Sequence, residues 1–292
     1  GYALSHLYPF STAYYRQFGF ASAARTVRWT VRLQDLRALP QVEGTVRQLF
    51  PGDSLAPLLE VYNKMYGDVN FSCLRETFDK ALEGDQPLAA KRWVFVWYDS
   101  AGLPGGFLVG TRQKDTLHCV PEFSSKDAFL FASPQALMGL LGFVRTAFIA
   151  NFEDIQFCVP AHIDLTALLP ELSGMNCSSV LNGMARAVNA RALLELCRCR
   201  GEGRLVLGVT DSIIPENNRS FALCFAPGQP NQVEPTNEAP DVTLDVGDLA
   251  VLLGGARDGA SLAYTLGVQV HRPSPALGQV FYSKPCHILD LF

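Results

Sequence analysis

Several familiar patterns are missing from this sequence of 292 residues, and each absence excludes a class of protein. Charged residues make up only 18% of the chain while hydrophobic residues make up 48%, which excludes a disordered chain. No apolar run reaches the length of a membrane span, so we expect no membrane partner. The net charge of −4 leaves no general basic surface, so we expect no nucleic-acid partner.

Patterned metal ligands are also missing. The eight cysteines are scattered, and the sequence has no C-x-x-C pair and no H-x-x-x-H. Only Cys197 and Cys199 are close together, with the spacing C-x-C. Most of the others lie in apolar runs, which is typical of buried thiols. The sequence therefore predicts no metal site and no disulfide framework.

What is present divides into three segments, and the first covers residues 1–42. It opens with a buried strand over residues 3–8, which a proline ends. A short helix with the paired tyrosines Tyr14 and Tyr15 follows, and an aromatic–glycine turn (residues 18–20) closes it. Residues 24–33 alternate polar and apolar side chains, which predicts a half-buried strand.

The second segment, residues 43–179, has the pattern of a complete domain. Asp53 or Ser54 is expected to cap a helix with apolar residues at a 3.6 period. Two apolar runs, residues 93–98 and 106–110, predict a hairpin. A strand over residues 128–132 precedes a helix with Ser133 as N-cap, and a further strand covers residues 155–159.

The third segment, residues 180–292, follows a predicted loop that contains Gly174, Cys177 and Asn182. Asn189 caps a predicted helix, and strands are predicted at residues 205–210 and 221–225. The proline-rich residues 227–240 predict a loop. Two short helices, residues 245–254 and 259–267, follow, and His271 and His287 flank a predicted final strand region.

In this order, the segments resemble the Eis-like (enhanced intracellular survival) acetyltransferases of the GNAT superfamily. The matching stretches are residues 7–11, residues 14–20, the tail and the residues that open the third segment, Met184 to Leu194. The resemblance implies a mixed α+β and α/β fold with three parts. These are the C-terminal part of a catalytic GNAT domain (1–42), a degenerate GNAT domain (43–179) and a sterol-carrier-protein-like α+β domain (180–292).

The resemblance also implies an activity and its setting. We expect a cytoplasmic N-acetyltransferase that takes acetyl-CoA and an amine, either an aminoglycoside, a polyamine-like small molecule or a protein lysine. A homo-oligomer, often a hexamer, is expected as well. The alternative from another class is a non-catalytic module that binds an apolar ligand as lipid carriers do, or that mainly builds an oligomer.

The GNAT pattern places a general acid four residues before the glycine of the aromatic–glycine turn. Counting back from Gly19 gives Tyr15, which would protonate the departing CoA thiolate. A phenol has a reference pKa near 10 and is protonated at neutral pH. Tyr14, the neighbouring aromatic residue, is expected to line the cofactor channel together with Tyr15.

The resemblance places a second catalytic group at the end of the chain, the α-carboxylate of Phe292. An ionised carboxylate can position the substrate ammonium and help to relay its proton. The last residues are mostly apolar, which favours a docked tail over a free one. Some members carry an acid beside the end. In this sequence the residue before Phe292 is Leu291, and the acid, Asp290, lies one position earlier. We assign Asp290 to substrate binding.

Acetyl-CoA binding in this superfamily needs a [Gln/Arg]-x-x-Gly-x-[Gly/Ala] loop at a helix N-terminus. We expect that loop to precede residue 1, and we therefore expect this chain alone to be inactive. At the equivalent place in the second segment no glycine is present and Pro134 removes a donor, so that domain is predicted not to bind CoA.

Trp93 is the remaining candidate. Together with Trp97 and Tyr98 it could line a substrate pocket, and we include Trp93 as a substrate-binding candidate. The alternative is an aromatic strand in the core of the second segment.

Overall fold

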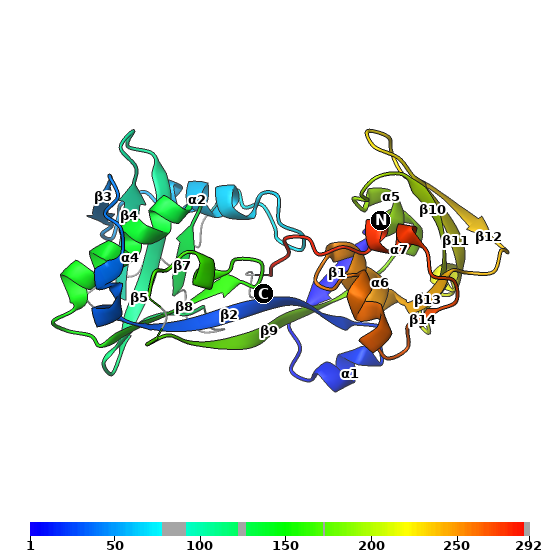
Figure 1. Ribbon diagram of the computed structural model, residues 1–292, viewed down its shortest axis with the longest axis horizontal. Coiled ribbons are helices and arrows are strands. Elements are labelled where there is room, and N and C mark those ends of the chain that lie inside the picture. The colour runs from blue at the N-terminus through cyan, green and yellow to red at the C-terminus, as the bar shows by residue number, and fades with distance from the viewer. Residues whose placement is uncertain (78–91, 122–126, 172, 289–292) are drawn as a thin grey trace. The chain divides into compact units, whose positions relative to one another are not determined.

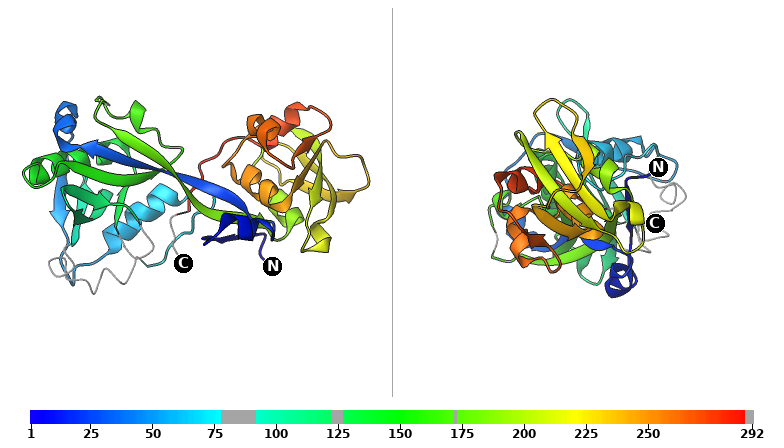
Figure 2. Two further views of the ribbon diagram at one scale, coloured as in Figure 1. Left: turned by 90° about the horizontal axis from the view of Figure 1, so that it is seen from below. Right: turned by 90° about the vertical axis from the view of Figure 1, so that its right-hand side faces the viewer.

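The computed structural model describes residues 1–77, 92–121, 127–171 and 173–288. Within these ranges the chain forms two compact units. One contains residues 1–25 and 181–288, and the other contains residues 26–180. Two strands of 12 residues each, β2 (Ala21–Arg32) and β9 (Asn176–Ala187), are divided between the units and are visible as the long blue and green ribbons of Figure 2. The predicted boundaries at 42/43 and 179/180 stay predictions.

The unit of residues 26–180 is built on a mixed sheet. Its described strands have the order β2–β8–β6–β5–β4–β3, and β7 pairs with β5 (Figure 1). β6 and β8 pair in parallel and the other pairs are antiparallel. The further elements are β3 (Thr45–Gln48), β4 (Arg92–Tyr98), β5 (Pro104–Gln113), β6 (Thr116–Cys119), β7 (Ala128–Phe131), β8 (Asp154–Pro160), α2 (Ala56–Tyr66), α4 (Pro134–Phe148), η1 (Leu33–Ala38) and η2 (Leu165–Ala167).

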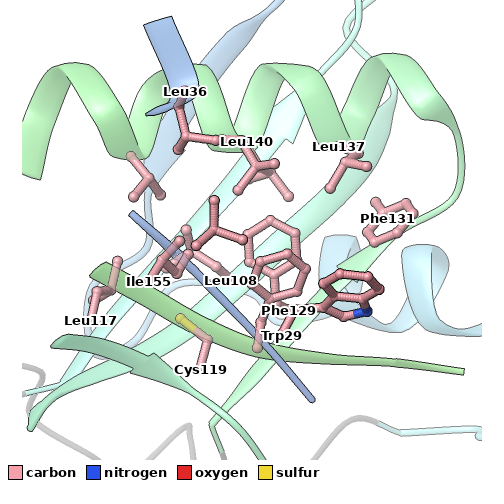
Figure 3. Packing of buried hydrophobic residues seen from close by; sticks show 14 of the residues in the cluster. Trp29, Leu36, Leu108, Leu117, Cys119, Phe129, Phe131, Leu137, Leu140 and Ile155 are labelled. Atoms are coloured by element: carbon pink, nitrogen blue, oxygen red, sulfur yellow. The ribbon is translucent and has the colours of Figure 1, made fainter. Parts of the chain in front are cut away.

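Each face of this sheet has its own core because neighbouring strand residues point to opposite sides. Leu108 of β5 packs with Leu137 and Leu140 of α4, as Figure 3 shows. Its neighbour Phe107 packs with Leu58 of α2 on the other face. Burial on both faces explains why the strands of this unit read as continuous apolar runs.

The unit of residues 1–25 and 181–288 contains a five-stranded sheet with the order β12–β11–β10–β13–β14. β10 and β13 pair in parallel and the other pairs are antiparallel. β1 (Leu4–Leu7) pairs with β9, with Leu4 opposite Ala187. The other elements are α1 (Thr12–Arg16), α5 (Ala190–Leu196), β10 (Gly203–Thr210), η3 (Pro215–Asn217), β11 (Arg219–Phe225), β12 (Gln232–Thr236), β13 (Val242–Asp245), α6 (Val246–Gly254), η4 (Gly259–Tyr264), β14 (Gln269–Val270) and α7 (Pro275–Val280).

The predicted mixed α/β fold is confirmed, but five local predictions are wrong. The N-cap of α2 is Leu55, so neither Asp53 nor Ser54 caps this helix. The stretch 227–240 is not only a loop, because it contains the edge strand β12 with Pro235 in it. Cys177 lies in β9 rather than in a loop. The second short helix is a 3₁₀-helix that ends at Tyr264, and the final strand region holds only β14 and then the helix α7.

Candidate functional site

Tyr14 and Tyr15 lie on α1, a helix of five residues. Ser11 is its N-cap, and the Ser11 hydroxyl accepts a hydrogen bond from the Tyr14 N–H at 3.3 Å. Short helices are weakly stable by themselves, so the cap and the packing of the tyrosines hold α1 in place.

An aromatic cluster surrounds the Tyr15 ring. The rings of Phe10 and Tyr14 lie 5.3 Å and 5.2 Å from it, both edge-on, and Phe20 lies at 6.2 Å. Tyr15 is half-buried, while Tyr14 is 45% exposed. Edge-to-face contacts on several sides fix the orientation of a ring, so the Tyr15 phenol is held rather than free to sample many positions.

The aromatic–glycine turn packs against the start of α6. Gly19 has φ +73°, and a Cβ at this position would lie 2.8 Å from Val246 Cγ2. Conversely, a Cβ at Gly247 would lie 2.7 Å from the carbonyl oxygen of Gly19. Both glycines are therefore required by a close approach of the two segments, which brings the tyrosine helix onto the third segment of the chain.

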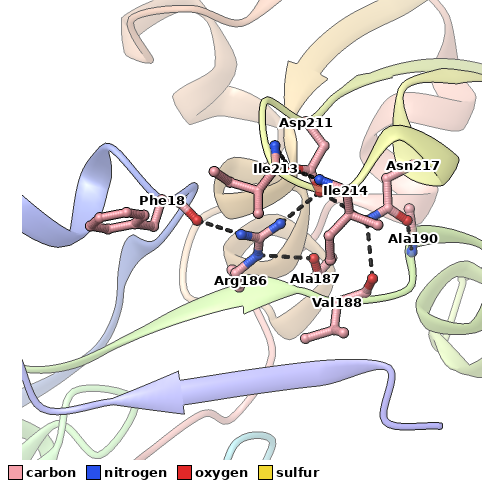
Figure 4. A network of polar contacts seen from close by, with 9 residues as sticks. All are labelled: Phe18, Arg186, Ala187, Val188, Ala190, Asp211, Ile213, Ile214 and Asn217. Carbon is pink, nitrogen blue, oxygen red and sulfur yellow. Dashed lines mark hydrogen bonds and ion pairs between the residues drawn. The ribbon is translucent and has the colours of Figure 1, made fainter.

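Arg186 of β9 ties the same turn to a buried polar network (Figure 4). Its side chain donates to the carbonyl oxygen of Phe18 at 2.5 Å and to Asp211 at 2.6 Å. The Arg186 side chain is 6% exposed and that of Asp211 is 1% exposed. Sequence reasoning missed this arginine, although a charged residue between apolar neighbours in a strand signals a buried partner.

Asp211 is the acceptor that balances this arginine. Burial acts to raise the pKa of its carboxyl, but hydrogen bonds from Asn217 and from the N–H groups of Ile213 and Ile214, together with the Arg186 charge, outweigh burial. The pKa of Asp211 therefore lies below its ordinary value. The carboxylate is ionised near neutral pH, and the pair holds the turn beside Tyr15.

The candidate residues of the tail, Asp290 and Phe292, lie outside the described residues. The chain up to Ile288 is described, and the Tyr8 hydroxyl donates a hydrogen bond to the Ile288 carbonyl oxygen at 3.2 Å. A Cβ at Gly183 would lie 2.8 Å from Ile288 Cδ1. Ile288 thus packs beside the end of the β1–β9 pair. The strand β1 of this pair is followed in the sequence by α1.

Trp93 lies in the unit of residues 26–180, whereas Tyr15 belongs to the other unit. Its ring contacts Phe148 at 5.6 Å and Phe152 at 5.9 Å, and it packs against the core beneath α4. This packing favours the core interpretation, and the substrate contact of Trp93 stays a prediction.

The spacing of a pyrophosphate loop occurs twice in the chain, over residues 16–21 and 198–203. Both stretches run from the end of a helix, α1 or α5, to the start of a strand. A pyrophosphate needs the reverse order, with N–H groups converging at a helix N-terminus. Neither stretch fits that role.

The equivalent place in the second segment is the start of α4. Pro134 occupies its first turn and has no N–H, while the Ser133 hydroxyl already accepts from the Ala136 N–H at 3.1 Å. These two features support the prediction that this domain does not bind CoA.

A cavity of about 830 Å³ lies among residues of the third segment. Leu262, Leu277 and Phe281 supply apolar walls, and Arg200 and Asp258 supply charge. Among the described residues, no three His, Cys, Asp or Glu side chains converge in a way that could hold a metal ion. None of the helices in the described ranges combines the length and the apolar content needed to cross a bilayer.

Comparison with known families assigns the third segment. A family model of the sterol carrier protein domain matches residues 185–285. These residues form a sterol carrier protein domain, as the resemblance implied. Comparison with curated proteins gives no significant match.

Comparison with solved structures extends the likeness to nearly the whole chain. A GCN5-related N-acetyltransferase from Anabaena variabilis matches with a TM-score of 0.80 and 20% identity, over 99% of this chain and 73% of that one. The chain has the fold of the GCN5-related N-acetyltransferases.

Two further structures agree with this GCN5-related fold. Eis1 from Mycobacterium abscessus matches with a TM-score of 0.74 and 16% identity, over 99% of this chain and 74% of that one. A probable N-acyltransferase of unknown function from Enterococcus faecalis matches with a TM-score of 0.77 and 21% identity. That match covers 92% of this chain, which spans 66% of the length of the Enterococcus protein.

Proposed function

We propose that this chain belongs to an acetyl-CoA-dependent N-acetyltransferase that acylates an amine. The observation that carries the proposal is the half-buried Tyr15, held by its aromatic neighbours beside the turn that Arg186 anchors. A GCN5-related fold around a phenol at this position supports acyl transfer more than any other chemistry. Since the chain spans about two thirds to three quarters of its structural relatives, the activity is proposed for the whole protein.

Acetyl-CoA supplies an activated acetyl thioester, whose transfer to an amine releases CoA as a thiolate. Tyr15 holds the proton that this thiolate needs, because a phenol is protonated at neutral pH. Tyr14, which is 45% exposed, offers an aromatic surface next to that proton. We assign the two tyrosines to the cofactor side of the site on this basis.

For the amine we propose the α-carboxylate of Phe292, with Asp290 as a substrate contact. Amine attack requires loss of a proton, and a carboxylate can hold the ammonium and pass that proton to water. The packing of Ile288 against Tyr8 and Gly183 supports a docked tail. The proposed substrate class is an aminoglycoside, a polyamine-like small molecule or a protein lysine. The proposed assembly is a cytoplasmic homo-oligomer such as a hexamer.

The experiment follows CoA release from acetyl-CoA with kanamycin-like polyamines, using the natural protein that carries this sequence. Tyr15→Phe removes the proton while keeping the ring, and we expect kcat to fall about 100-fold or more. Tyr14→Phe is the matched control, and its kcat should stay within roughly threefold of the unchanged protein if its ring only lines the channel. Equal activity of Tyr15→Phe and the unchanged protein would refute the general-acid role.

A second candidate function, binding of an apolar ligand, is favoured by the cavity of about 830 Å³. Gly278 on α7 lines this cavity, and a Cβ there would meet nothing within 4 Å. Gly278→Leu should therefore fill the cavity without a clash and abolish binding of a fluorescent acyl-chain probe. Gly142→Leu on α4, where a Cβ also meets nothing, is the control. Absence of probe binding to the unchanged protein would exclude the carrier function.

A further inference from the structure

The two cysteines with the C-x-C spacing meet in space. The sulfur atoms of Cys197 and Cys199 lie 3.7 Å apart, directly after the end of α5. Both residues are half-buried rather than fully enclosed. Cys197 and Cys199 are the only two of the eight cysteines that lie close together in the sequence. The proposed acetyl transfer does not use them.

Polar groups gather around this pair of thiols. The Asn231 side-chain amide lies 3.4 Å from the Cys197 sulfur and 3.9 Å from the Cys199 sulfur, and it also donates to the Cys197 carbonyl oxygen at 2.7 Å. The Lys284 side chain is buried, its ammonium donates to the Leu253 carbonyl oxygen at 2.7 Å, and its charge acts on both thiols. A cation and an amide donor are groups that stabilise a thiolate.

The surroundings make the two thiols unequal. The hydrogen bond from Cys197 lowers the pKa of the Cys199 thiol, and Lys284 and Asn231 act in the same direction against burial. The same hydrogen bond and burial raise the pKa of the Cys197 thiol. The Cys197 thiol also donates to the Leu194 carbonyl oxygen at 3.2 Å, an acceptor that favours its protonated form. Cys199 is therefore the better nucleophile, and Cys197 is placed to react second.

We propose that Cys197 and Cys199 form a thiol–disulfide exchange site that takes small-molecule disulfides such as glutathione disulfide. The Cys199 thiolate attacks one sulfur of that molecule, which forms a mixed disulfide and releases the first small thiolate. The Cys197 sulfur then attacks Cys199, the Cys197–Cys199 bond forms, and the second small thiolate leaves with the Cys197 proton. The protein dithiol loses two electrons and the small disulfide gains them.

The geometry allows the last step with a small local movement. The sulfurs must approach from 3.7 Å to a bond length near 2.05 Å. Residues 197–199 lie outside helix and strand, so no ladder hydrogen bond opposes this movement. The next residue is fixed, since the Arg200 N–H donates to the Gln279 carbonyl oxygen at 2.8 Å. The movement is therefore confined to the segment between α5 and Arg200.

The test incubates the full natural protein with graded ratios of glutathione disulfide to glutathione, blocks free thiols with iodoacetamide, and maps tryptic peptides by mass. Trypsin cuts after Arg198, between the two cysteines, so the internal disulfide appears as residues 192–198 linked to residues 199–200. We expect this linked pair in the unchanged protein and its disappearance after reduction. Its absence at every ratio, or linkage of either cysteine to another one, would overturn the proposal.

Single variants assign the order of the two steps. Cys197→Ser should stop at a glutathione adduct on Cys199. Cys199→Ser should form an adduct on Cys197 roughly tenfold more slowly. Cys224→Ser, a half-buried cysteine of the same unit, is the control and should form the linked pair as the unchanged protein does. Equal adduct rates on Cys197 and Cys199 would show that Cys199 is not the preferred nucleophile.

Discussion

The phenol of Tyr8 donates a hydrogen bond to the carbonyl oxygen of Ile288 at 3.2 Å, across 280 positions of sequence. This bond joins the stretch that leads into α1 to the stretch that leads into the tail. Gly183 completes the contact, because any side chain there would meet Ile288. The backbone and the side chain of Ile288, the last described residue, are therefore both held in place, as the proposed role of the Phe292 carboxylate requires.

Tyr8→Phe should weaken this anchor while keeping the ring. Loss of one half-buried hydrogen bond should lower the free energy of unfolding by about 1 kcal/mol, and urea unfolding measures it. Hydrogen exchange at residues 286–288 should become faster. Tyr2→Phe, at a side chain that is 87% exposed, is the control. If both variants behave alike, the hydrogen bond contributes nothing to holding this stretch.

Arg186→Met should lower the free energy of unfolding far more than the change in side-chain volume suggests. It leaves the buried Asp211 carboxylate without its cation, which costs about 3–5 kcal/mol of unfolding free energy. In the proposed enzyme, kcat should fall as well, since the turn beside Tyr15 loses the bond to Phe18.

The control for Arg186 is Arg191→Met. Arg191 forms an exposed ion pair with Glu195 at 2.9 Å, and its loss should cost less than about 0.5 kcal/mol. A similar loss of stability in both variants would contradict the special role of the buried pair.

Asp248 should make stability depend on pH. Burial, and then the nearby Asp245, raise the pKa of its carboxyl, and Arg257 only partly opposes them. The folded protein then holds this proton more tightly than the unfolded chain does. The Asp248 contribution is therefore full below the ordinary Asp value of about 3.9 and is lost as the pH rises through the folded-state pKa.

Asp248→Asn cannot titrate, so its stability relative to the unchanged protein should increase as the pH rises through that range. Urea unfolding at several pH values measures this difference. The exposed Glu43→Gln variant serves as the control. A difference that stays constant with pH would show that Asp248 titrates alike in the folded and unfolded chains.

Two glycines of α4 should respond in opposite ways to alanine. A Cβ at Gly139 would lie 2.1 Å from Trp97 Nε1, so Gly139→Ala should overpack the core and cost about 1–3 kcal/mol. A Cβ at Gly142 would meet nothing within 4 Å, so Gly142→Ala should stabilise the helix by about 0.5–1 kcal/mol. Thermal unfolding compares them, and the same sign for both would contradict this description of the packing.

Local signals predicted much of the fold. The cap at Ser133, the apolar face of α4 and the cap at Asn189 each depend on residues a few positions apart, and all three are confirmed. The strand β9 was not predicted from Cys177 because its pairing is not local. Its residue Ala187 lies opposite Leu4. The amino-acid composition around Cys177 does not indicate a partner so far away in the sequence.

In the candidate site, too, features set by neighbouring residues could be predicted and features set by distant residues could not. The positions of Tyr14 and Tyr15 on a short helix before Gly19 could be predicted from a run of seven residues, 14–20. The role of Arg186 could not, because its acceptor on Phe18 lies 168 positions away. The contact of Cys197 with Cys199 depends on how the chain turns after α5, which a spacing does not determine.

Pro235 stands in β12, the outermost strand on one side of the five-stranded sheet. A residue without an N–H leaves a gap in the hydrogen bonds that such a border could offer to a neighbouring molecule. We expect this border to pair less readily with a strand of a second copy. We therefore expect any assembly of copies to use side chains elsewhere on the surface rather than this strand.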